Sequence, residues 1–125
     1  MRYVGIDYGD KKVGIALGSE GGTMAFPETV LKNDPTLFAV VRALAKEYGD
    51  RVVIGDSRAN DGSENPIAKE ARAFGTRLEA DGVTVAYEPE FYTSREAERI
   101  QGRNSMSDAS AAAIMLTSYL RRTTR

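Results

Sequence analysis

Acidic side chains are the main candidates for chemistry in this sequence of 125 residues, which contains no histidine and no cysteine. These two absences remove the commonest general base, thiol nucleophiles and zinc sites built from thiolates. A reaction near neutral pH would therefore rely on carboxylates, hydroxyls, lysines or a hard metal ion. Three acidic positions stand out by their place relative to the expected strands and helices, namely Asp7, Asp108, and either Glu88 or Glu90.

Asp7 lies at the end of the expected first strand, residues 2–8, and has Gly5 and Gly9 on either side. If that strand lies in the middle of a sheet, the carboxylate emerges at the rim, where it needs a partner or a metal ion. The alternative is an aspartate that caps a hairpin turn. Asp108 lies in the first turn of the expected last helix, where the helix dipole alone also favours an acid.

Glu88 and Glu90 follow the expected strand 83–87 and have the same parity if the strand continues past Pro89. One of them should stand at the carboxyl end of a parallel strand, where ligand sites form in sheets of this kind. The alternative is a solvated loop acid. Several carboxylates in close contact stay ionised only with a cation, and oxygen-only ligands suit Mg²⁺ or Mn²⁺. Two such ions about 4 Å apart can activate a water and stabilise the leaving oxygen of a phosphodiester.

The elements that must position these acids follow from hydrophobic periodicity and turn residues. Strands are expected at 2–8, 12–18, 23–31, 51–55 and 83–87. The third is weaker and contains Pro27, which suggests an edge strand or a bulge. Helices are expected from Asp34-Pro35 to Gly49, from Asn65-Pro66 to Ala80, from Thr93 to Gly102, and from Ser105 or Ser107 to Leu120. The order β-β-β-α-β-α-β-α-α predicts one α/β domain over residues 1–125, with a mixed five-stranded sheet and helices packed on it.

The charge balance is close to neutral, with a formal net charge of −1. That value argues mildly against a strong nonspecific nucleic-acid binder, although a local basic patch can still bind. The sequence shows neither an apolar run long enough to span a membrane nor a secretory signal at its N-terminus. We therefore expect a cytoplasmic protein without a membrane partner.

Five short motifs occur in order over almost the whole chain, namely Gly5-Ile6-Asp7-Tyr8-Gly9, Lys11-Lys12-Val13-Gly14-Ile15-Ala16, Asp61-Gly62-Ser63, Thr93-Ser94 with Ala97, and Asp108-Ala109-Ser110-Ala111-Ala112 with Leu116 and Tyr119-Leu120. In residues and spacing they resemble the YqgF/RuvX family. The resemblance implies an RNase H-like fold and a nuclease, either one that matures the 5′ end of pre-16S ribosomal RNA or a Holliday junction resolvase that acts on branched DNA. The three family acids map to Asp7, Glu90 and Asp108.

These three acids are the expected catalytic residues and the expected ligands of Mg²⁺ or Mn²⁺, with Asp7 bridging the ions. The sequence departs from the family at two places. The usual Asp-Glu-Arg triplet reads Pro89-Glu90-Phe91 here, and the usual Gly-Leu-Pro-Leu reads Gly55-Asp56-Ser57-Arg58. The position of Thr93-Ser94 favours Glu90 over Glu88 as the ligand. The departures put the choice of substrate in question and leave open a catalytically weakened nucleic-acid-binding protein.

Basic residues flank the acids and are expected to hold the phosphates of a nucleic acid. The candidates are Lys11, Lys12, Arg58, Arg95 and Arg99, and Arg103 continues the four-residue spacing of the last two. The alternative for each is a solvated, salt-bridged surface. Tyr8, Phe91 and Tyr92 are candidates for stacking on unpaired bases, and packing of the bend between strand and helix is the alternative role of Phe91 and Tyr92. A homodimer remains open, because RNase H-like resolvases often need two sites. An ATPase of the actin type is disfavoured, because it needs two such lobes.

Overall fold

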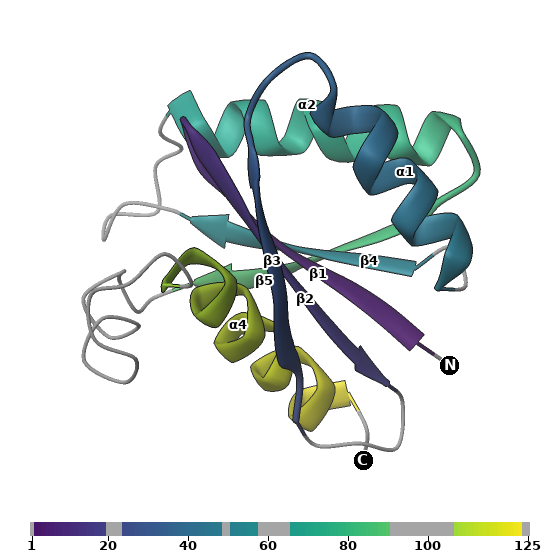
Figure 1. The fold of residues 1–125 in the computed structure, drawn as a ribbon. Coiled ribbons are helices and arrows are strands. Elements are labelled where there is room, and N and C mark those ends of the chain that lie inside the picture. The colour runs from purple at the N-terminus through teal and green to yellow at the C-terminus, as the bar shows by residue number, and fades with distance from the viewer. Residues whose placement is uncertain (1, 20–23, 49–50, 58–65, 91–106, 124–125) are drawn as a thin grey trace.

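The structure is a computed structural model that describes residues 2–19, 24–48, 51–57, 66–90 and 107–123. One sheet contains β1 (Arg2–Tyr8), β2 (Lys12–Ser19), β3 (Phe26–Lys32), β4 (Arg51–Ser57) and β5 (Thr84–Glu90), in the spatial order β3-β2-β1-β4-β5. The described helices are α1 (Leu37–Glu47), α2 (Pro66–Ala80) and α4 (Ser107–Thr123). Helices α1 and α2 cover one face of the sheet and α4 covers the other (Figure 1).

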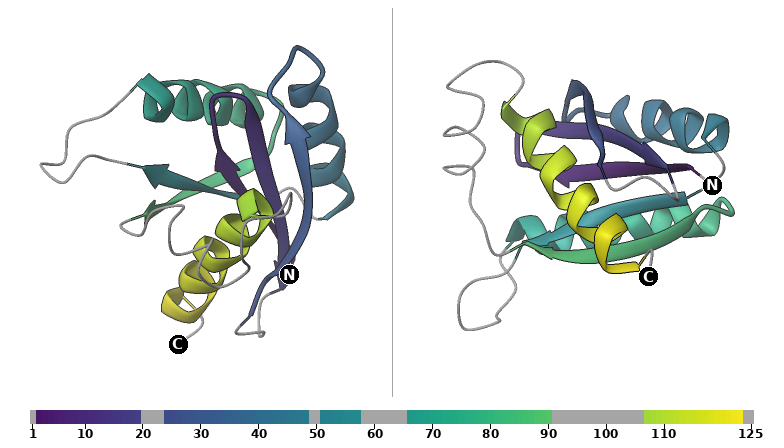
Figure 2. Two further views of the ribbon diagram at one scale, coloured as in Figure 1. Left: turned by 60° about the vertical axis from the view of Figure 1, so that its left-hand side comes forward. Right: turned by 90° about the horizontal axis from the view of Figure 1, so that it is seen from below.

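The strand directions confirm the predicted mixed sheet. Strands β1, β2 and β3 form an antiparallel meander, whereas β1, β4 and β5 are parallel. The carboxyl ends of the three parallel strands therefore meet at one edge of the sheet, which we call the carboxyl edge. Helix α4 begins at this edge, on the left of Figure 1 and of the right-hand view in Figure 2. None of the described helices is both long and apolar enough to cross a membrane.

Some element boundaries differ from those expected. Strand β3 begins at Phe26, and it has both features that Pro27 suggested, an edge position and a register shift where it pairs with Ile15 and Ala16. Strand β5 continues through Pro89 to Glu90, which is possible because β5 is also an edge strand. The helix expected after Thr93 lies outside the described residues.

Helix α1 begins at Leu37, later than the Asp34-Pro35 start that the sequence indicates. The carboxylate of Asp34 accepts hydrogen bonds from the backbone amide and the hydroxyl of Thr36, and the amide of Leu37 donates to the carbonyl of Asp34. These short-range bonds form a turn before the regular helix. The bonds from Thr36 also lower the pKa of Asp34.

Two apolar clusters fill the space on either side of the sheet. The cluster under α1 and α2 contains strand residues such as Val4, Ile6 and Ile54, together with Val41 and Leu78 from the helices. The cluster under α4 is built from smaller side chains, and it contains Ala16, Val53, Ala112, Met115, Leu116 and Leu120. The alternation of β-strand side chains thus sends neighbouring residues of one strand into different clusters.

Glycines in the sheet allow α4 to lie close to it. A Cβ atom added to Gly5 in β1 would lie 2.9 Å from Cβ of Leu116, and one added to Gly18 in β2 would lie 2.8 Å from Cδ1 of Leu120. Real Cβ atoms do not approach other atoms so closely, so larger residues at these positions would push the helix outward. Gly5 therefore limits the distance between α4 and the middle of β1, and Gly18 does so further from the carboxyl edge, where β2 pairs with the start of β1.

We predict that Gly5→Ala lowers the free energy of unfolding by about 1–3 kcal/mol, because the added methyl group overpacks the contact with Leu116. Urea denaturation followed by circular dichroism measures the change. In the double variant Gly5→Ala/Leu116→Ala, the Leu116 atoms beyond Cβ are gone, so the combined loss should be smaller than the sum of the two single losses. Additive losses would show that the overpacking comes from Cβ of Leu116, which the double variant keeps, whereas an unchanged free energy of unfolding in Gly5→Ala would show that Gly5 does not limit the approach of α4.

Candidate active site

Asp7 lies near the carboxyl edge on the face of the sheet that α4 covers. Val4 and Ile6 belong to the cluster under α1 and α2, whereas Gly5 faces Leu116 of α4. Strand alternation then assigns Asp7 to the α4 side. Its side chain is partly buried, and it interacts with other groups of the protein. The sequence prediction that the Asp7 carboxylate emerges at the rim of a central strand agrees with this position.

Glu90 and Asp108 are described only by their backbone positions. Glu90 is the last residue of β5, paired in register with Ser57 at the end of β4. Asp108 is the second residue of α4 and lies two helical turns, about 12 Å, before Leu116, which covers Gly5. The backbones of both residues therefore lie toward the edge at which β1 ends. Their roles, like that of Asp7, stay predictions.

The chemistry of these three residues fits a hard divalent cation, because each supplies only carboxylate oxygens. Within the described part of the chain, no group of three His, Cys, Asp or Glu residues forms a metal site. The side chains of Glu90 and Asp108 lie outside that part. If an ion binds here, Asp7 is the described side chain best placed to hold it.

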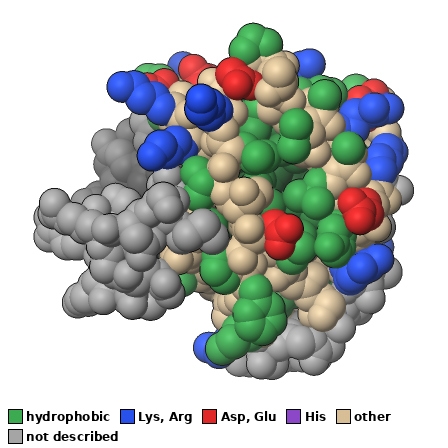
Figure 3. Space-filling model, in the orientation of Figure 1, with side chains coloured by type: hydrophobic (Ala, Val, Ile, Leu, Met, Phe, Trp, Pro, Cys, Tyr) green, Lys and Arg blue, Asp and Glu red, His purple; other side chains and the backbone are tan. Residues whose placement is uncertain are grey.

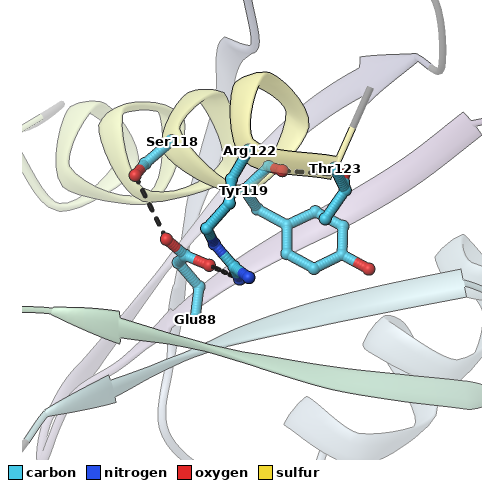
Figure 4. Close-up of polar contacts among 5 residues, drawn as sticks. All are labelled: Glu88, Ser118, Tyr119, Arg122 and Thr123. Atoms are coloured by element: carbon cyan, nitrogen blue, oxygen red, sulfur yellow. Dashed lines mark hydrogen bonds and ion pairs between the residues drawn. The ribbon is translucent and has the colours of Figure 1, made fainter. Parts of the chain in front are cut away.

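Glu88 has a different environment from that expected of a ligand at the rim. Its side chain is buried, and its two carboxylate oxygens are taken by residues of α4 (Figure 4). Oε2 accepts a hydrogen bond of 3.1 Å from the Ser118 hydroxyl, and Oε1 forms an ion pair with the Arg122 guanidinium. Figure 4 shows the carboxylate pointing from β5 toward the helix. Glu88 thus ties the second half of α4 to the edge of the sheet.

The environment of Arg122 agrees with this role. The hydrogen bond from Arg122 to Glu88, together with the attraction between their opposite charges, raises the pKa of the guanidinium. The same guanidinium lies 5.7 Å from the ring centre of Tyr119, whose own ring packs edge-on against Tyr3. Burial raises the pKa of the Tyr119 hydroxyl. Glu88 is therefore the acidic member of a packed cluster that joins β5, α4 and β1.

The opposite face of the sheet holds Tyr8, a candidate for stacking on a base, and Asp56, which belongs to a segment that departs from the family pattern. Tyr8 packs against Phe74 with ring centres 5.4 Å apart, so it contributes to the cluster under α1 and α2. This contact gives Tyr8 a role in packing, and because its side chain is only partly buried, stacking on a base stays a prediction. Asp56 forms an ion pair of 2.9 Å with Arg72 of α2. Alternation separates both residues from the face that carries Asp7.

Of the five basic residues expected to bind substrate, only Lys11 and Lys12 are described. Both are exposed where β1 turns into β2, at the carboxyl edge. Arg58, Arg95 and Arg99, and likewise Arg103, Phe91 and Tyr92, lie outside the described residues. Lys32, which the sequence analysis did not single out, pairs with Lys12 across β2 and β3. Figure 3 shows Lys and Arg side chains at the upper left of the molecule and others along its right side.

A separate groove of about 850 Å³ lies between α4 and the start of β3. Its walls are mostly apolar, and they include Phe26, Ile114 and Thr117, with Arg121 and Arg122 among the lining residues. Among the residues that the structure describes, the lining includes no aspartate or glutamate. The described lining is therefore distinct from the position of Asp7, and it offers no carboxylate to a cation.

Solved structures with a similar fold include two resolvases described with their DNA substrates. The fowlpox virus resolvase, in complex with a Holliday junction, superimposes with a TM-score of 0.66 at 13% identity and covers 100% of both chains. RuvC from T. thermophilus, in complex with a Holliday junction substrate, gives a TM-score of 0.60 at 20% identity and covers 99% of this chain and 98% of its own. At these identities the likeness establishes the fold, which is the RNase H-like α/β fold that the sequence predicted.

Two curated relatives share more of the sequence, and both carry the name "Putative pre-16S rRNA nuclease". The protein from Bordetella petrii is 35% identical over 118 residues, which cover 91% of this chain and 90% of the relative. The protein from Cupriavidus necator is 38% identical over 117 residues, which cover 90% of this chain and 83% of the relative. The family model described as "RuvX: Holliday junction resolvase" matches residues 1–122. Because the family model and the relatives span nearly the whole sequence, this chain belongs to the RuvX family.

Proposed function

We propose that this chain is a nuclease that uses Mg²⁺ or Mn²⁺ to hydrolyse phosphodiester bonds in structured nucleic acid. Its first-choice reaction is the maturation of the 5′ end of pre-16S ribosomal RNA in the cytoplasm, as part of ribosome biogenesis. The observation that carries the proposal is the position of Asp7 on the α4 side of the carboxyl edge, in a chain whose curated relatives are named for this reaction. Residues 1–125 would form one catalytic domain.

In this proposal Asp7, Glu90 and Asp108 hold the cation. When bound, the cation activates a water and stabilises the leaving oxygen of the phosphodiester. The carboxylates provide the negative charge that retains the ion, and Asp7 is held in place by the central strand of the sheet. Lys11, Lys12, Arg58, Arg95 and Arg99 would position the nucleic acid through its phosphates.

The environment of Glu88 supports Glu90 as the third acid. Both carboxylate oxygens of Glu88 are bound by residues of α4. Glu88 would therefore have to give up its ion pair with Arg122 in order to coordinate a metal. Breaking the pair would leave the buried Glu88 carboxylate without its bond to Arg122, which is unfavourable although Arg122 itself is largely exposed. Glu90 is two residues further along the same strand, about 7 Å nearer the carboxyl edge, and has the same parity.

We predict that Asp7→Asn lowers the rate of metal-dependent cleavage by roughly two orders of magnitude or more, because the amide removes a charged ligand while keeping the shape. The measurement is cleavage of a precursor 16S RNA fragment with Mg²⁺ or Mn²⁺, resolved on a sequencing gel. Circular dichroism should show an unchanged fold. Full activity of this variant would exclude Asp7 from the reaction.

Replacement by glutamine should affect mainly cleavage at Glu90 and mainly stability at Glu88. Glu90→Gln is expected to abolish cleavage with little effect on the free energy of unfolding. Glu88→Gln is expected to lower that free energy by about 1–3 kcal/mol, because it weakens charge-assisted bonds to Ser118 and Arg122, while cleavage persists below the unfolding temperature. Activity assays paired with urea denaturation measure both effects. The reverse pattern would make Glu88 the ligand.

A Holliday junction is the second candidate substrate, because the matching family model is described as a Holliday junction resolvase. Symmetrical cuts in a junction need two sites, so this reaction predicts a homodimer in solution. Cleavage rates on a four-way DNA junction and on the RNA fragment, together with light scattering, separate the two substrates. Preference for the junction by a dimer would replace the RNA proposal.

A catalytically weakened binding protein is the remaining alternative, motivated by Pro89-Glu90-Phe91 in place of the family triplet. It predicts that purified protein binds RNA or junction DNA but cuts neither with either ion. Under that outcome Asp7→Asn would leave binding unchanged and there would be no activity to lose. The same cleavage assay therefore distinguishes this alternative from the nuclease.

A further inference from the structure

Two lysines face each other across neighbouring strands close to the candidate active site. Lys12 at the start of β2 and Lys32 at the end of β3 are direct partners in the antiparallel register, and both are exposed. Side chains of such partners leave the sheet on the same face, with Cβ atoms about 5 Å apart. Within the described chain, neither lysine forms an ion pair with an acidic side chain.

The lysine pair lies on the same face of the sheet as Asp7. In β2, Ala16 belongs to the cluster under α4, so alternation assigns Lys12 to the α4 side. Asp7 pairs in register with Gly14, which makes Lys12 its diagonal neighbour at about 7–8 Å between Cα atoms. Lys32 lies on β3, one strand further from β1 than Lys12. The two lysines therefore lie beside Asp7 at the carboxyl edge, on the side of β2 and β3.

The backbone around the pair is held by bonds between the two turns at this edge. The amide of Asn33 donates to the carbonyl of Lys11 at 2.9 Å, and the Asn33 side-chain amide donates to the carbonyl of Gly9 at 2.8 Å. These bonds join the end of β3 to the turn between β1 and β2. The stems of Lys12 and Lys32 therefore start from positions fixed relative to the end of β1.

Like charges at directly opposite positions of a sheet are destabilising, so this pair lowers the stability of the free protein unless an anion lies between the ammonium groups. Hydrogen bonds from Thr36 lower the pKa of the Asp34 carboxyl group, and Asp34 is close enough for the charge of Lys32 to contribute to this, so it offsets part of the charge of Lys32. A phosphate group can accept hydrogen bonds from two lysines at once.

We propose that Lys12 and Lys32 together bind one phosphate of the substrate backbone beside the bond to be cut, and that Lys32 is a substrate-positioning residue. This inference rests on the proposed function for its substrate class, a nucleic acid. It adds that the contact is made jointly, so both lysines are needed for the same phosphate. The phosphate would enter on the side of Asp7 that faces β3.

The test compares Lys12→Gln, Lys32→Gln and the double variant, with Lys46→Gln as the matched control. Lys46 is an exposed lysine in the last turn of α1, at the end of that helix that lies away from the carboxyl edge. Fluorescence anisotropy without divalent ions measures the affinity for a labelled precursor 16S RNA fragment and for a four-way DNA junction. Affinities at several salt concentrations give the number of phosphates contacted.

Loss of one phosphate contact should reduce the slope of log affinity against log salt by about 0.7–0.9. Because the two lysines share one phosphate, each single variant should show most of this reduction in slope. The slope of the double variant should fall no further than that of either single variant. Lys46→Gln should keep the wild-type slope. Slopes that fall additively in the two single variants, or that match the control in Lys32→Gln, would overturn the shared site.

The thermal stability of the free protein gives a second readout that requires no activity. Lys32→Gln should raise the melting temperature at low salt, because it removes the repulsion, and the gain should vanish near 1 M salt. Inorganic tripolyphosphate should raise the melting temperature of wild type more than that of Lys32→Gln. Equal responses to tripolyphosphate would contradict the joint site.

Failure of this inference can be distinguished from failure of the proposed function. If wild type cuts RNA and Lys32→Gln behaves as Lys46→Gln does in kcat/KM and in salt slope, the nuclease stands and the lysine site falls. If wild type binds but never cuts, while the slopes change as expected, the lysine site stands and the nuclease falls. If wild type binds neither nucleic acid, both are overturned.

Discussion

Close packing of α4 on the sheet is the constraint on which the candidate site depends. Gly5 and Gly18 leave room beneath Leu116 and Leu120, and alanines at the start of the helix keep its inner surface flat. A helix held at a larger distance would carry the backbone of Asp108 away from the end of β1. The same contact buries the apolar surface that stabilises this layer, so the fold and the position of the acids share one origin.

Strand alternation then divides the polar residues of the carboxyl edge between two layers with different roles. Asp7 and Lys12 belong to the face under α4, where the carboxyl edge is lined with charges. Asp56 belongs to the other face, where Arg72 neutralises it. Tyr8 is also on that face and packs against the core. Acids and bases close in sequence can therefore have unrelated functions, because one residue of offset changes the layer.

Ion pairing separates the structural acid from the candidate catalytic acids along the α4 face. Glu88 is neutralised by Arg122 and fixed by Ser118, so it holds the second half of α4 in place. The ends of β1 and β5 remain for groups that a cation can gather. Lys12 and Lys32 extend this pattern, since their mutual repulsion is useful only if an anion binds between them. In this arrangement, the buried apolar contacts lie in the middle of the sheet, and the groups proposed for catalysis and phosphate binding lie at its edge.

The sequence alone determined the order of the described elements and the mixed sheet, because hydrophobic period and turn residues are local properties of the chain, and it singled out Asp7 as a candidate. It could not separate Glu88 from Glu90 by chemistry, since both are glutamates of one parity. Tertiary structure decided that Glu88 is engaged, through a hydrogen bond to a residue 34 positions away, and that Lys32 stands opposite Lys12. Such contacts depend on strand register and helix docking, which arise only when distant segments pack together.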